Sequence, residues 1–310
     1  MSSLREFSYP SSDQIHTVHA QEWLPDGPVR GVVQIVHGLS EHMGRYETVA
    51  RFFNEYGFLV CGEDHLGHGK TVDDGKFGYF GPKGGWELVL RDVRRLREIQ
   101  GEKYPGVPYV MLGHSMGSFL TRTYLIRWPG DLDGGVLSGT GQEPAVVVAF
   151  GKAVSGLLCK LRGADHRSVL VYSLSLGAYN KQFKPNRTPS DWLSRDEAAV
   201  DAFREDRLCR FLPTCGLFRD MLGGLQVIVK KTNLARMDKA TPVYFFSGGQ
   251  DPVGAQGRGV EKVAAMFRAA GCKNVSVKLY PGGRHEMFHE INRQEAMENL
   301  LKWLEENIYI

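Results

Sequence analysis

The residue with the clearest potential for chemistry is Ser115, at the centre of the run Gly-His-Ser-Met-Gly from 113 to 117. An apolar run, 109–112, precedes it and indicates a buried strand, and residues 118–126 have the pattern of a helix. A Gly-x-Ser-x-Gly run between a strand and a helix predicts a nucleophile elbow, a strained turn that exposes the serine hydroxyl. The pentapeptide alone also fits an ordinary glycine-rich turn, so the prediction depends on partners elsewhere in the chain.

A serine hydroxyl becomes a good nucleophile when a base removes its proton and an acid orients that base. Asp251 follows the apolar run 242–246 in a loop rich in glycine and proline, and His285 follows the alternating run 276–280 on another loop. The order serine, acid, histidine is that of hydrolases with this elbow. Such an aspartate also commonly serves only a turn. We favour His285 over His289 as the base because we expect His289 to lie within the following helix.

The negative charge that develops on an ester oxygen needs preorganised backbone N–H donors. One donor is the residue after the nucleophile, Met116, and the other comes from an early strand-to-helix loop. Residues 32–36 are a strong strand candidate that opens into His37-Gly38-Leu39, so Leu39 is the predicted second donor. His37-Gly38 also fits a simple tight turn, but the elbow, acid and base in the right order favour the donor role.

Two further motifs carry a resemblance to a known family. They are the block 37–46, His-Gly-Leu-Ser-Glu-His-Met-Gly-Arg-Tyr, and the run 64–71, Asp-His-Leu-Gly-His-Gly-Lys-Thr. Together with the elbow and the loops of Asp251 and His285, they make the chain resemble the α/β-hydrolases of the monoacylglycerol lipase and lysophospholipase group, which includes S33-like serine aminopeptidases. The resemblance covers residues 25–140 and 240–310 well and the middle of the chain poorly.

The resemblance implies roles for eight residues. Ser115, Asp251 and His285 would form a catalytic triad, Leu39 and Met116 would donate to the oxyanion, and Glu41, Arg45 and His289 would lie near the glycerol end of the substrate. Glu41 and Arg45 also fit a structural ion pair. The chain departs from the family at Lys70-Thr71, where a serine usually follows the second glycine, in a loop outside the triad. Neither a metal nor an organic cofactor is implied.

Strand-like and helix-like stretches alternate from Gly31 to about Leu137, which predicts a mostly parallel sheet covered by helices. We therefore expect the α/β-hydrolase fold, with a core built from residues 1–140 and 235–310. The expected strands are 32–36, 58–61, 109–112 and 135–137, and the expected helices are 46–56, 86–104 and 116–127. Residues 17–20 and 21–24 fit the two arms of an antiparallel hairpin at the edge of the sheet.

The alternation stops near residue 141, and residues 141–234 indicate a helical cap over the active site. Six apolar residues there repeat at helical spacing: Val147, Phe150, Val154, Leu157, Leu158 and Leu161. We favour packing of this stripe against the core. The alternative is a membrane-facing or acyl-binding lip, with Ala149, Ala153 and Gly156 lining an acyl tunnel on the other side. Residues 194–197 resemble a capping box, and a second helix is expected at 221–232.

Composition excludes several classes of protein. The net charge is +3 and the charges are spread along the chain, so the sequence has no basic cluster of the kind that binds nucleic acid. Five scattered cysteines suit a reducing compartment without a structural disulfide or zinc site. The sequence lacks a signal-peptide core and any run of the ~18 apolar residues that span a membrane, so we expect a cytoplasmic enzyme. Gly-Lys-Thr at 69–71 resembles the end of a phosphate-binding loop, but Asp64 stands where the first glycine would be.

These features predict a carboxylic-ester hydrolase that acts on a monoacylglycerol or lysophospholipid-like ester through an acyl-enzyme, with transient contact between the cap and a membrane surface. A serine aminopeptidase on the same fold is one alternative. It would need acidic groups in the cap, for which Asp191, Asp196, Glu197 and Asp201 are candidates, although a helix-dipole role suits them better. A non-catalytic binding protein is another alternative, but such proteins commonly lack a triad member. Acyl length, head group and oligomeric state stay open.

Overall fold

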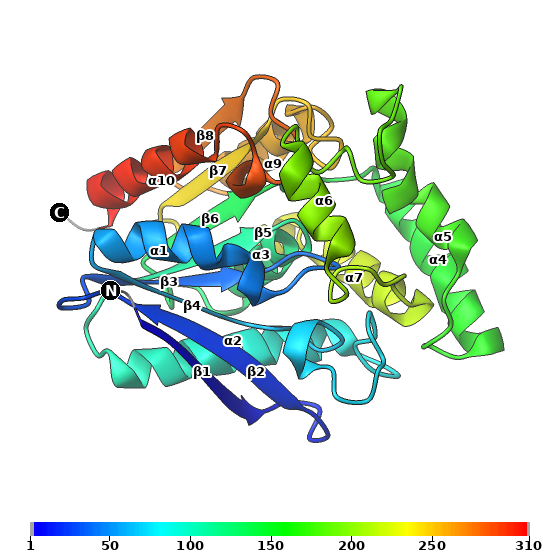
Figure 1. The fold of residues 1–310 in the computed structure, drawn as a ribbon, viewed down its shortest axis with the longest axis horizontal. Coiled ribbons are helices and arrows are strands. Elements are labelled where there is room, and N and C mark those ends of the chain that lie inside the picture. Colours follow the sequence, from blue (N-terminus) through cyan, green and yellow to red (C-terminus); the bar gives the residue numbers. More distant parts are fainter. Residues whose placement is uncertain (1–2, 309–310) are drawn as a thin grey trace.

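The computed structural model describes residues 3–308 and is built around one eight-stranded sheet (Figure 1). In chain order, the strands are β1 (Ser3–Pro10), β2 (Thr17–Leu24), β3 (Gly31–Val36), β4 (Phe58–Glu63), β5 (Tyr109–His114), β6 (Gly134–Ser138), β7 (Val243–Gly248) and β8 (Val275–Tyr280). Their order across the sheet is β1-β2-β4-β3-β5-β6-β7-β8. All neighbours from β4 to β8 are parallel, which confirms the mostly parallel sheet that the alternation predicts.

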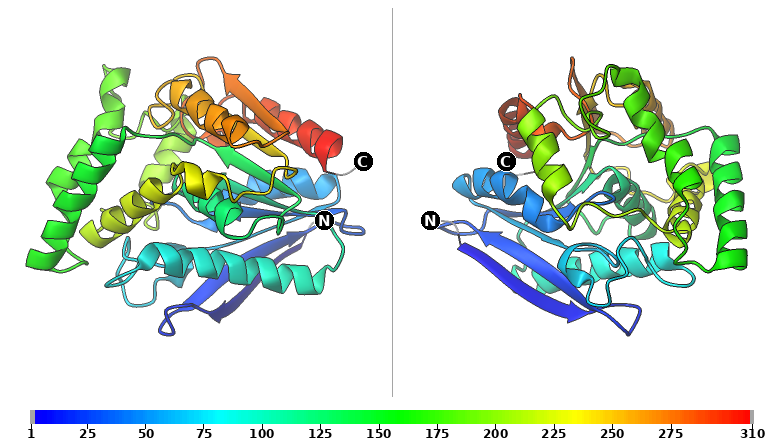
Figure 2. Two further views of the ribbon diagram at one scale, coloured as in Figure 1. Left: turned by 180° about the vertical axis from the view of Figure 1, so that it is seen from behind. Right: turned by 45° about the vertical axis from the view of Figure 1, so that its right-hand side comes forward.

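Helices cover both faces of this sheet (Figures 1 and 2). One face carries α1 (Glu47–Glu55) and α10 (Arg293–Asn307), and the other carries α2 (Gly85–Lys103), α3 (Met116–Arg127) and α9 (Arg258–Ala269). Each face has its own cluster of buried apolar side chains. A parallel sheet needs both faces covered, since the crossover connections place helices on each side.

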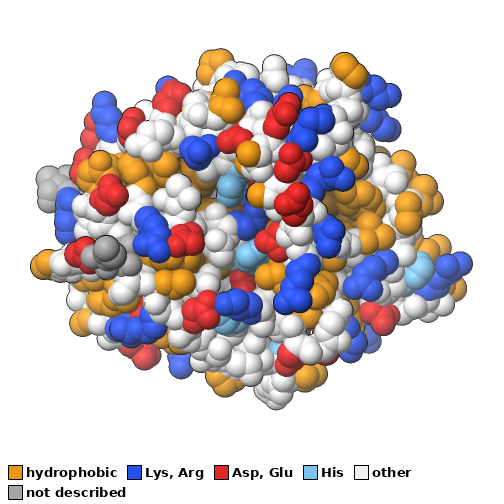
Figure 3. Space-filling model, viewed as in Figure 1, with side chains coloured by type: hydrophobic (Ala, Val, Ile, Leu, Met, Phe, Trp, Pro, Cys, Tyr) orange, Lys and Arg blue, Asp and Glu red, His pale blue; other side chains and the backbone are white. Residues whose placement is uncertain are grey.

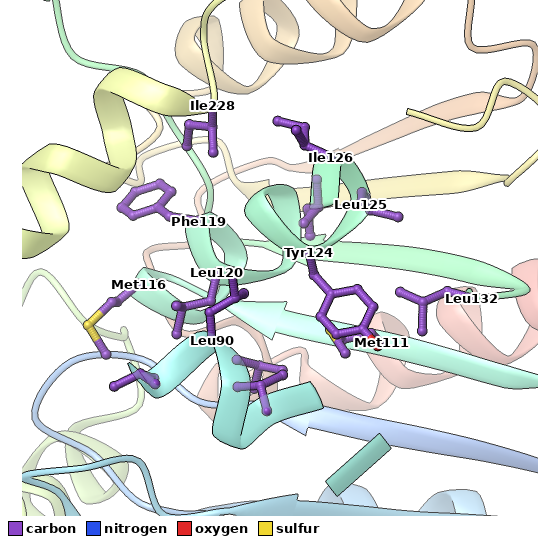
Figure 4. Close-up of a cluster of buried hydrophobic side chains, with 14 of the residues drawn as sticks. Leu90, Met111, Met116, Phe119, Leu120, Tyr124, Leu125, Ile126, Leu132 and Ile228 are labelled. Carbon is purple, nitrogen blue, oxygen red and sulfur yellow. The ribbon is translucent and has the colours of Figure 1, made fainter. Parts of the chain in front are cut away.

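The helix that follows the elbow is buried on every side. All residues of α3 except Arg127 are buried. Figure 4 shows Phe119, Leu120 and Tyr124 of this helix among side chains from α2 and β5, including Leu90 and Met111. A helix buried all round has little freedom to move, so its first turn is a rigid support for the serine that precedes it.

The predicted edge hairpin is present, but the prediction of its strands is wrong. Residues 17–20 and 21–24 form one continuous strand, β2, and its antiparallel partner is β1, with Phe7 opposite Ala20. The turn lies between β1 and β2, where the Asp13 carboxylate accepts hydrogen bonds from the backbone N–H groups of Ile15 and His16. Residues 17–24 contain no glycine, asparagine or proline, so their sequence does not favour a turn at Ala20-Gln21.

A long insertion, residues 139–242, separates β6 from β7 and extends to the right of the sheet in Figure 1. Its helices are α4 (Ala145–Arg162), α5 (Val169–Leu174), α6 (Glu197–Glu205), α7 (Cys215–Val227) and α8 (Lys231–Leu234). The prediction of a helix at 221–232 is wrong in its bounds, because Thr214 caps α7 by accepting from the Leu217 N–H. The helix after Ser194 is confirmed, but its cap is Asp196, which accepts from Ala198 and Ala199.

The apolar stripe of α4 faces outward, so the favoured packing interpretation is wrong for most of its residues. Val147, Phe150, Leu157 and Leu161 are between 55% and 71% exposed. The face of α4 toward α7 carries instead Val148 and Ser155, which are buried, and Lys152, which bonds Gln226. Helical spacing shows which residues share one face of a helix. It does not show which face packs against the protein, because that depends on a distant segment, here residues 215–227.

The expected acyl tunnel beside this helix is also contradicted. Ala149 and Ala153 are exposed, and a Cβ added to Gly156 would contact nothing within 4 Å. Figure 3 shows hydrophobic side chains gathered on the right of the molecule, over α4 and α5. On α5, Val169, Leu170 and Leu174 add to the exposed apolar surface. Within residues 3–308, none of the helices combines the length and apolar character needed to cross a membrane.

Candidate active site

The backbone at Ser115 is strained, as an elbow requires. Ser115 joins β5 to α3 with φ 52° and ψ −118°, a positive φ that residues other than glycine seldom adopt. A Cβ added to Gly113 would lie 2.3 Å from the carbonyl oxygen of Gly117, and one added to Gly117 would lie 1.8 Å from that of Val36. The two glycines are therefore required by the close approach of neighbouring backbone.

Asp251 and His285 are joined in a buried pair. The Nδ1–H of His285 donates to Asp251 Oδ1 at 3.0 Å, and the two side chains are 2% and 0% exposed. The Asp251 carboxylate also accepts from the Ser247 hydroxyl and the Val253 N–H, both at 2.9 Å. These bonds fix the orientation of the imidazole and direct its Nδ1 proton to the carboxylate, which leaves Nε2 to accept a proton.

Burial and charge act in opposite directions on this pair. Burial alone raises the pKa of Asp251, but the charge of His285 and the hydrogen bonds outweigh it and the pKa is lowered. Burial alone lowers the pKa of His285, but Asp251 outweighs it and the pKa is raised above its usual 6.5. A histidine of this kind is a stronger base than a free imidazole.

Ser115 and His285 line one cavity with a volume of about 440 Å³. Within residues 3–308 no hydrogen bond joins the Ser115 hydroxyl to His285, and catalytic hydrogen bonds often tighten only when substrate is bound. The loop with Gly38 and Leu39 lines the same cavity. A Cβ added to Gly38 would come within 3.1 Å of the Ser115 Cβ, so this loop lies directly against the elbow. Met116 opens α3, where the first N–H groups have no partner within the helix.

His285 is packed between the elbow and the insertion. The ring of His114 lies 4.8 Å from that of His285, and the ring of Trp192 lies at 4.9 Å. Burial lowers the pKa of His114 to about 4, so this ring is neutral near pH 7. The insertion also bonds the backbone here, since the Glu286 N–H donates to the Leu193 carbonyl at 2.8 Å. The sequence did not indicate Trp192, because its contact with His285 joins segments 93 positions apart.

Behind the cavity, Arg45 is held between two carboxylates. Its guanidinium donates to Glu41 at 2.8 Å and to both oxygens of Glu286 at 2.8 and 2.7 Å. All three side chains are at most 8% exposed. The ion pair that the sequence left open for Glu41 and Arg45 therefore exists. Glu286 was missed, and its only sequence signal is its position directly after His285.

The predicted substrate residues are placed unequally around the cavity. Glu41 lines it, whereas Arg45 and His289 are not among its lining residues. His289 lies in a short 3-10 turn, Met287–His289, before α10 begins, and its Nε2 donates to the Arg45 carbonyl at 3.1 Å. The expectation that His289 lies within the final helix is therefore wrong. Carboxylates also hold the backbone of the loop that carries Glu41: the Gly38 N–H donates to the Glu41 carboxylate, and the Met43 N–H donates to that of Asp64.

The sheet order, the elbow between β5 and α3 and the insertion after β6 together define a class, the serine hydrolases of the α/β-hydrolase fold. The chain belongs to the family described as serine aminopeptidase, S33, whose model matches residues 27–292. Its relatives include esterases and lipases, which confirms the predicted class of serine ester hydrolase.

Two relatives and one solved structure illustrate the likeness. A monoacylglycerol lipase of Mycolicibacterium smegmatis is 30% identical over 294 residues, which cover 91% of this chain and 90% of the relative. A monoglyceride lipase of Homo sapiens is 27% identical over 306 residues, covering 92% and 91%. A thermostable carboxyl esterase from Bacillus coagulans, solved in complex with glycerol, superposes with a TM-score of 0.92 at 32% identity, covering 99% and 100%.

Proposed function

We propose that the chain hydrolyses monoacylglycerol-type carboxylic esters through a covalent acyl-enzyme on Ser115. His285 takes the proton of the Ser115 hydroxyl as it attacks the ester carbonyl, and then gives that proton to the leaving alcohol. Asp251 stabilises the imidazolium that forms in between. Water then attacks the acyl-enzyme, with His285 again as the base. The observation that carries the proposal is that a strained serine and a histidine held by a buried aspartate share one cavity.

The backbone N–H groups of Leu39 and Met116 are the proposed oxyanion donors. The contact of Gly38 with the elbow brings the Leu39 loop beside Ser115, and Met116 follows Ser115 directly. Both donors belong to rigid backbone, so they would need little reorganisation when charge develops on the substrate oxygen. The chemistry uses only groups of this chain, and no cofactor enters it.

Charges at the cavity favour an ester over the substrate of an aminopeptidase. Of the four acidic candidates in the insertion, none lines the cavity. Asp191 accepts from Thr188, Asp196 caps α6, and Asp201 pairs with Arg187. Glu197 is 3.7 Å from the same guanidinium, that of Arg187.

The carboxylates that do line the cavity, Glu41 and Glu286, are both paired with Arg45. Two arginines, Arg204 and Arg210, complete the charged lining. Within residues 3–308 neither of them has an ion pair. A substrate ammonium would therefore meet positive charge without a free carboxylate, which disfavours it.

We further propose that residues 141–234 act as a cap on the core formed by 1–140 and 235–310. Trp192, Leu176 and Phe211 bring apolar side chains from this segment into the cavity wall, where they suit an acyl chain. The exposed apolar residues of α4 and α5 suit contact with a lipid surface. Glu41 would contact the glycerol end, while Arg45 and His289 would hold Glu41 and its loop in place.

Turnover of matched substrates tests the proposal. The purified protein is given a monoacylglycerol and an amino-acid amide, and rates are compared for wild type, Ser115→Ala and Ser190→Ala. Ser190 lines the same cavity, so its variant controls for loss of a hydroxyl there. We expect ester hydrolysis that only Ser115→Ala abolishes. Amide turnover above ester turnover would favour the peptidase, and equal loss in both serine variants would contradict the assignment of Ser115.

A further inference from the structure

A mixed cluster of metal-ligand side chains lies where the insertion meets the loop of Glu41. It consists of His42, on that loop, with Asp206 and Cys209, which follow α6. The His42 Nε2 is 2.7 Å from Asp206 Oδ2, and all three ligand atoms lie within 4.8 Å of one another. Cys209 is buried and contributes to the wall of the catalytic cavity, whereas the side chains of His42 and Asp206 are 14% and 30% exposed.

Three carboxylates and one guanidinium lie near enough to the Cys209 thiol to affect its pKa. Burial raises the pKa of the Cys209 thiol, Arg45 opposes that shift, and the carboxylates of Asp206, Glu41 and Glu286 add to it. A cation bound at Cys209 would be attracted by these carboxylates, of which Asp206 would contact it directly.

We propose that His42, Asp206 and Cys209 bind a thiolate-preferring divalent metal ion such as Zn²⁺, and that the bound ion inhibits the enzyme. A nitrogen, a carboxylate oxygen and a sulfur are the ligands that zinc takes at about 2.0–2.3 Å, which places ligand atoms about 3.3–3.8 Å apart in a tetrahedron. The His42–Asp206 separation of 2.7 Å is shorter than that range and no ligand pair exceeds 4.8 Å, so side-chain movements of about 1 Å or less suffice. Three protein ligands leave the fourth position for water or substrate.

Metal binding requires protons to move on two of the ligands, Cys209 and His42. The Cys209 thiol loses its proton to solvent and coordinates as thiolate. His42 now accepts from the Gly44 N–H at Nδ1, at 3.2 Å, and donates from Nε2 to Asp206. To present the Nε2 lone pair, the ring must carry its proton on Nδ1 instead and give up the Gly44 bond. Affinity should therefore rise with pH, since one proton is released for each ion bound.

Inhibition follows from what the three ligands join. Asp206 and Cys209 belong to the insertion, and His42 belongs to the loop that carries Leu39 and Glu41. A metal bridge would fix the insertion against that loop at the cavity wall and slow substrate entry, for which we infer that the two segments must separate. This inference goes beyond ester hydrolysis, and metal binding can be measured without any activity.

The binding arm uses Co²⁺ as the probe, because thiolate coordination gives a near-ultraviolet charge-transfer band. We expect wild type to bind one equivalent with that band, and Cys209→Ser to lose the band while Cys215→Ser, another buried cysteine, keeps it. Asp206→Asn, which preserves shape, should weaken binding by more than about tenfold. His16→Ala controls for the exposed cluster with Asp73 and Asp74. If Cys209→Ser keeps the band, the proposal is wrong.

The activity arm uses Zn²⁺ alone and a short ester, with each variant normalised to its own rate without metal. We expect Zn²⁺ to lower the rate of wild type, Cys215→Ser and His16→Ala at equal concentrations. Cys209→Ser and Asp206→Asn should need more than about tenfold more Zn²⁺ for the same loss. Equal inhibition of all variants would place the inhibitory metal elsewhere and overturn the proposal, while leaving the assignment of Ser115 intact.

Discussion

The catalytic loops and helix α4 differ in what fixes their residues. At the elbow, an added Cβ on Gly117 would lie 1.8 Å from a backbone oxygen, and Asp251 and His285 are buried and bonded. On α4, five large apolar residues face solvent at more than half exposure, and only Val148 and Ser155 are buried. A loop fixed by backbone contacts admits few substitutions, whereas an exposed helix face leaves its sequence free for a partner such as a lipid surface.

The largest effect should come from the proposed triad. His285→Ala and Asp251→Ala should each lower kcat substantially, with losses near 10⁴-fold typical of such groups. The double variant should be little worse than His285→Ala, because the two side chains act as one unit. Steady-state kinetics on an activated ester measure this. Losses that multiply would mean that Asp251 and His285 act independently.

The next contrast separates His285 from His289. Within the same loop region, His285 pairs with Asp251, whereas His289 bonds the Arg45 carbonyl. His289→Ala should keep acylation by an activated ester within roughly tenfold of wild type and change the preference among glycerol esters, since removing one hydrogen bond costs about 1 kcal/mol. His285→Ala should lose both activities. Similar losses in the two variants would refute the choice of His285 as the base.

The pH profile should report the Asp251–His285 pair. The base must be neutral to accept a proton, and Asp251 raises the pKa of His285 above 6.5. Below that pKa the imidazole is protonated, so kcat/KM should rise with pH through a value above 6.5 and then level off. In Asp251→Asn, burial is opposed only by the smaller effects of Glu286 and Glu41, so the acid limb should move to lower pH. An unchanged limb in that variant would show that Asp251 does not set the pKa.

The smallest effects on stability should come from the exposed stripe of α4. Phe150→Ser should change the free energy of unfolding by no more than about 0.5 kcal/mol, as surface substitutions do. Val148→Ser, on the buried face, should cost about 2 kcal/mol or more. Denaturant unfolding compares the two. Phe150→Ser together with Leu157→Ser should also reduce co-sedimentation with phospholipid vesicles, and undiminished binding would remove the proposed lipid contact.

The sequence predicted those parts of the fold that depend on local pattern and backbone sterics. Short apolar runs predicted β3 and β5, and the spacing of Gly113 and Gly117 predicted the elbow. Each of these patterns is local and is compatible with only one backbone conformation. The first hairpin was misplaced because β1, which pairs with β2, carries mostly exposed residues and so has a weak hydrophobic pattern.

Features that join distant segments were beyond the sequence. The orientation of α4 depends on α7, the contact of Trp192 with His285 depends on how the insertion folds back, and Glu286 acquires its role from Arg45, 241 positions earlier. The cluster of His42 with Cys209 has no spacing motif for the same reason, since its ligands lie on opposite sides of the elbow in the chain. Contacts between such charged and aromatic side chains can be identified only from the folded structure, where the distant segments lie together.

Peptide mapping after labelling with a fluorophosphonate tests the central claim most directly. The reagent phosphonylates a serine only when a neighbouring base activates it, so the labelled peptide identifies the nucleophile. We expect one phosphonyl group per chain, on the peptide that carries Ser115, in wild type and in Ser190→Ala, and none in His285→Ala. A label on another residue, or a label on Ser115 that survives His285→Ala at full rate, would contradict the account.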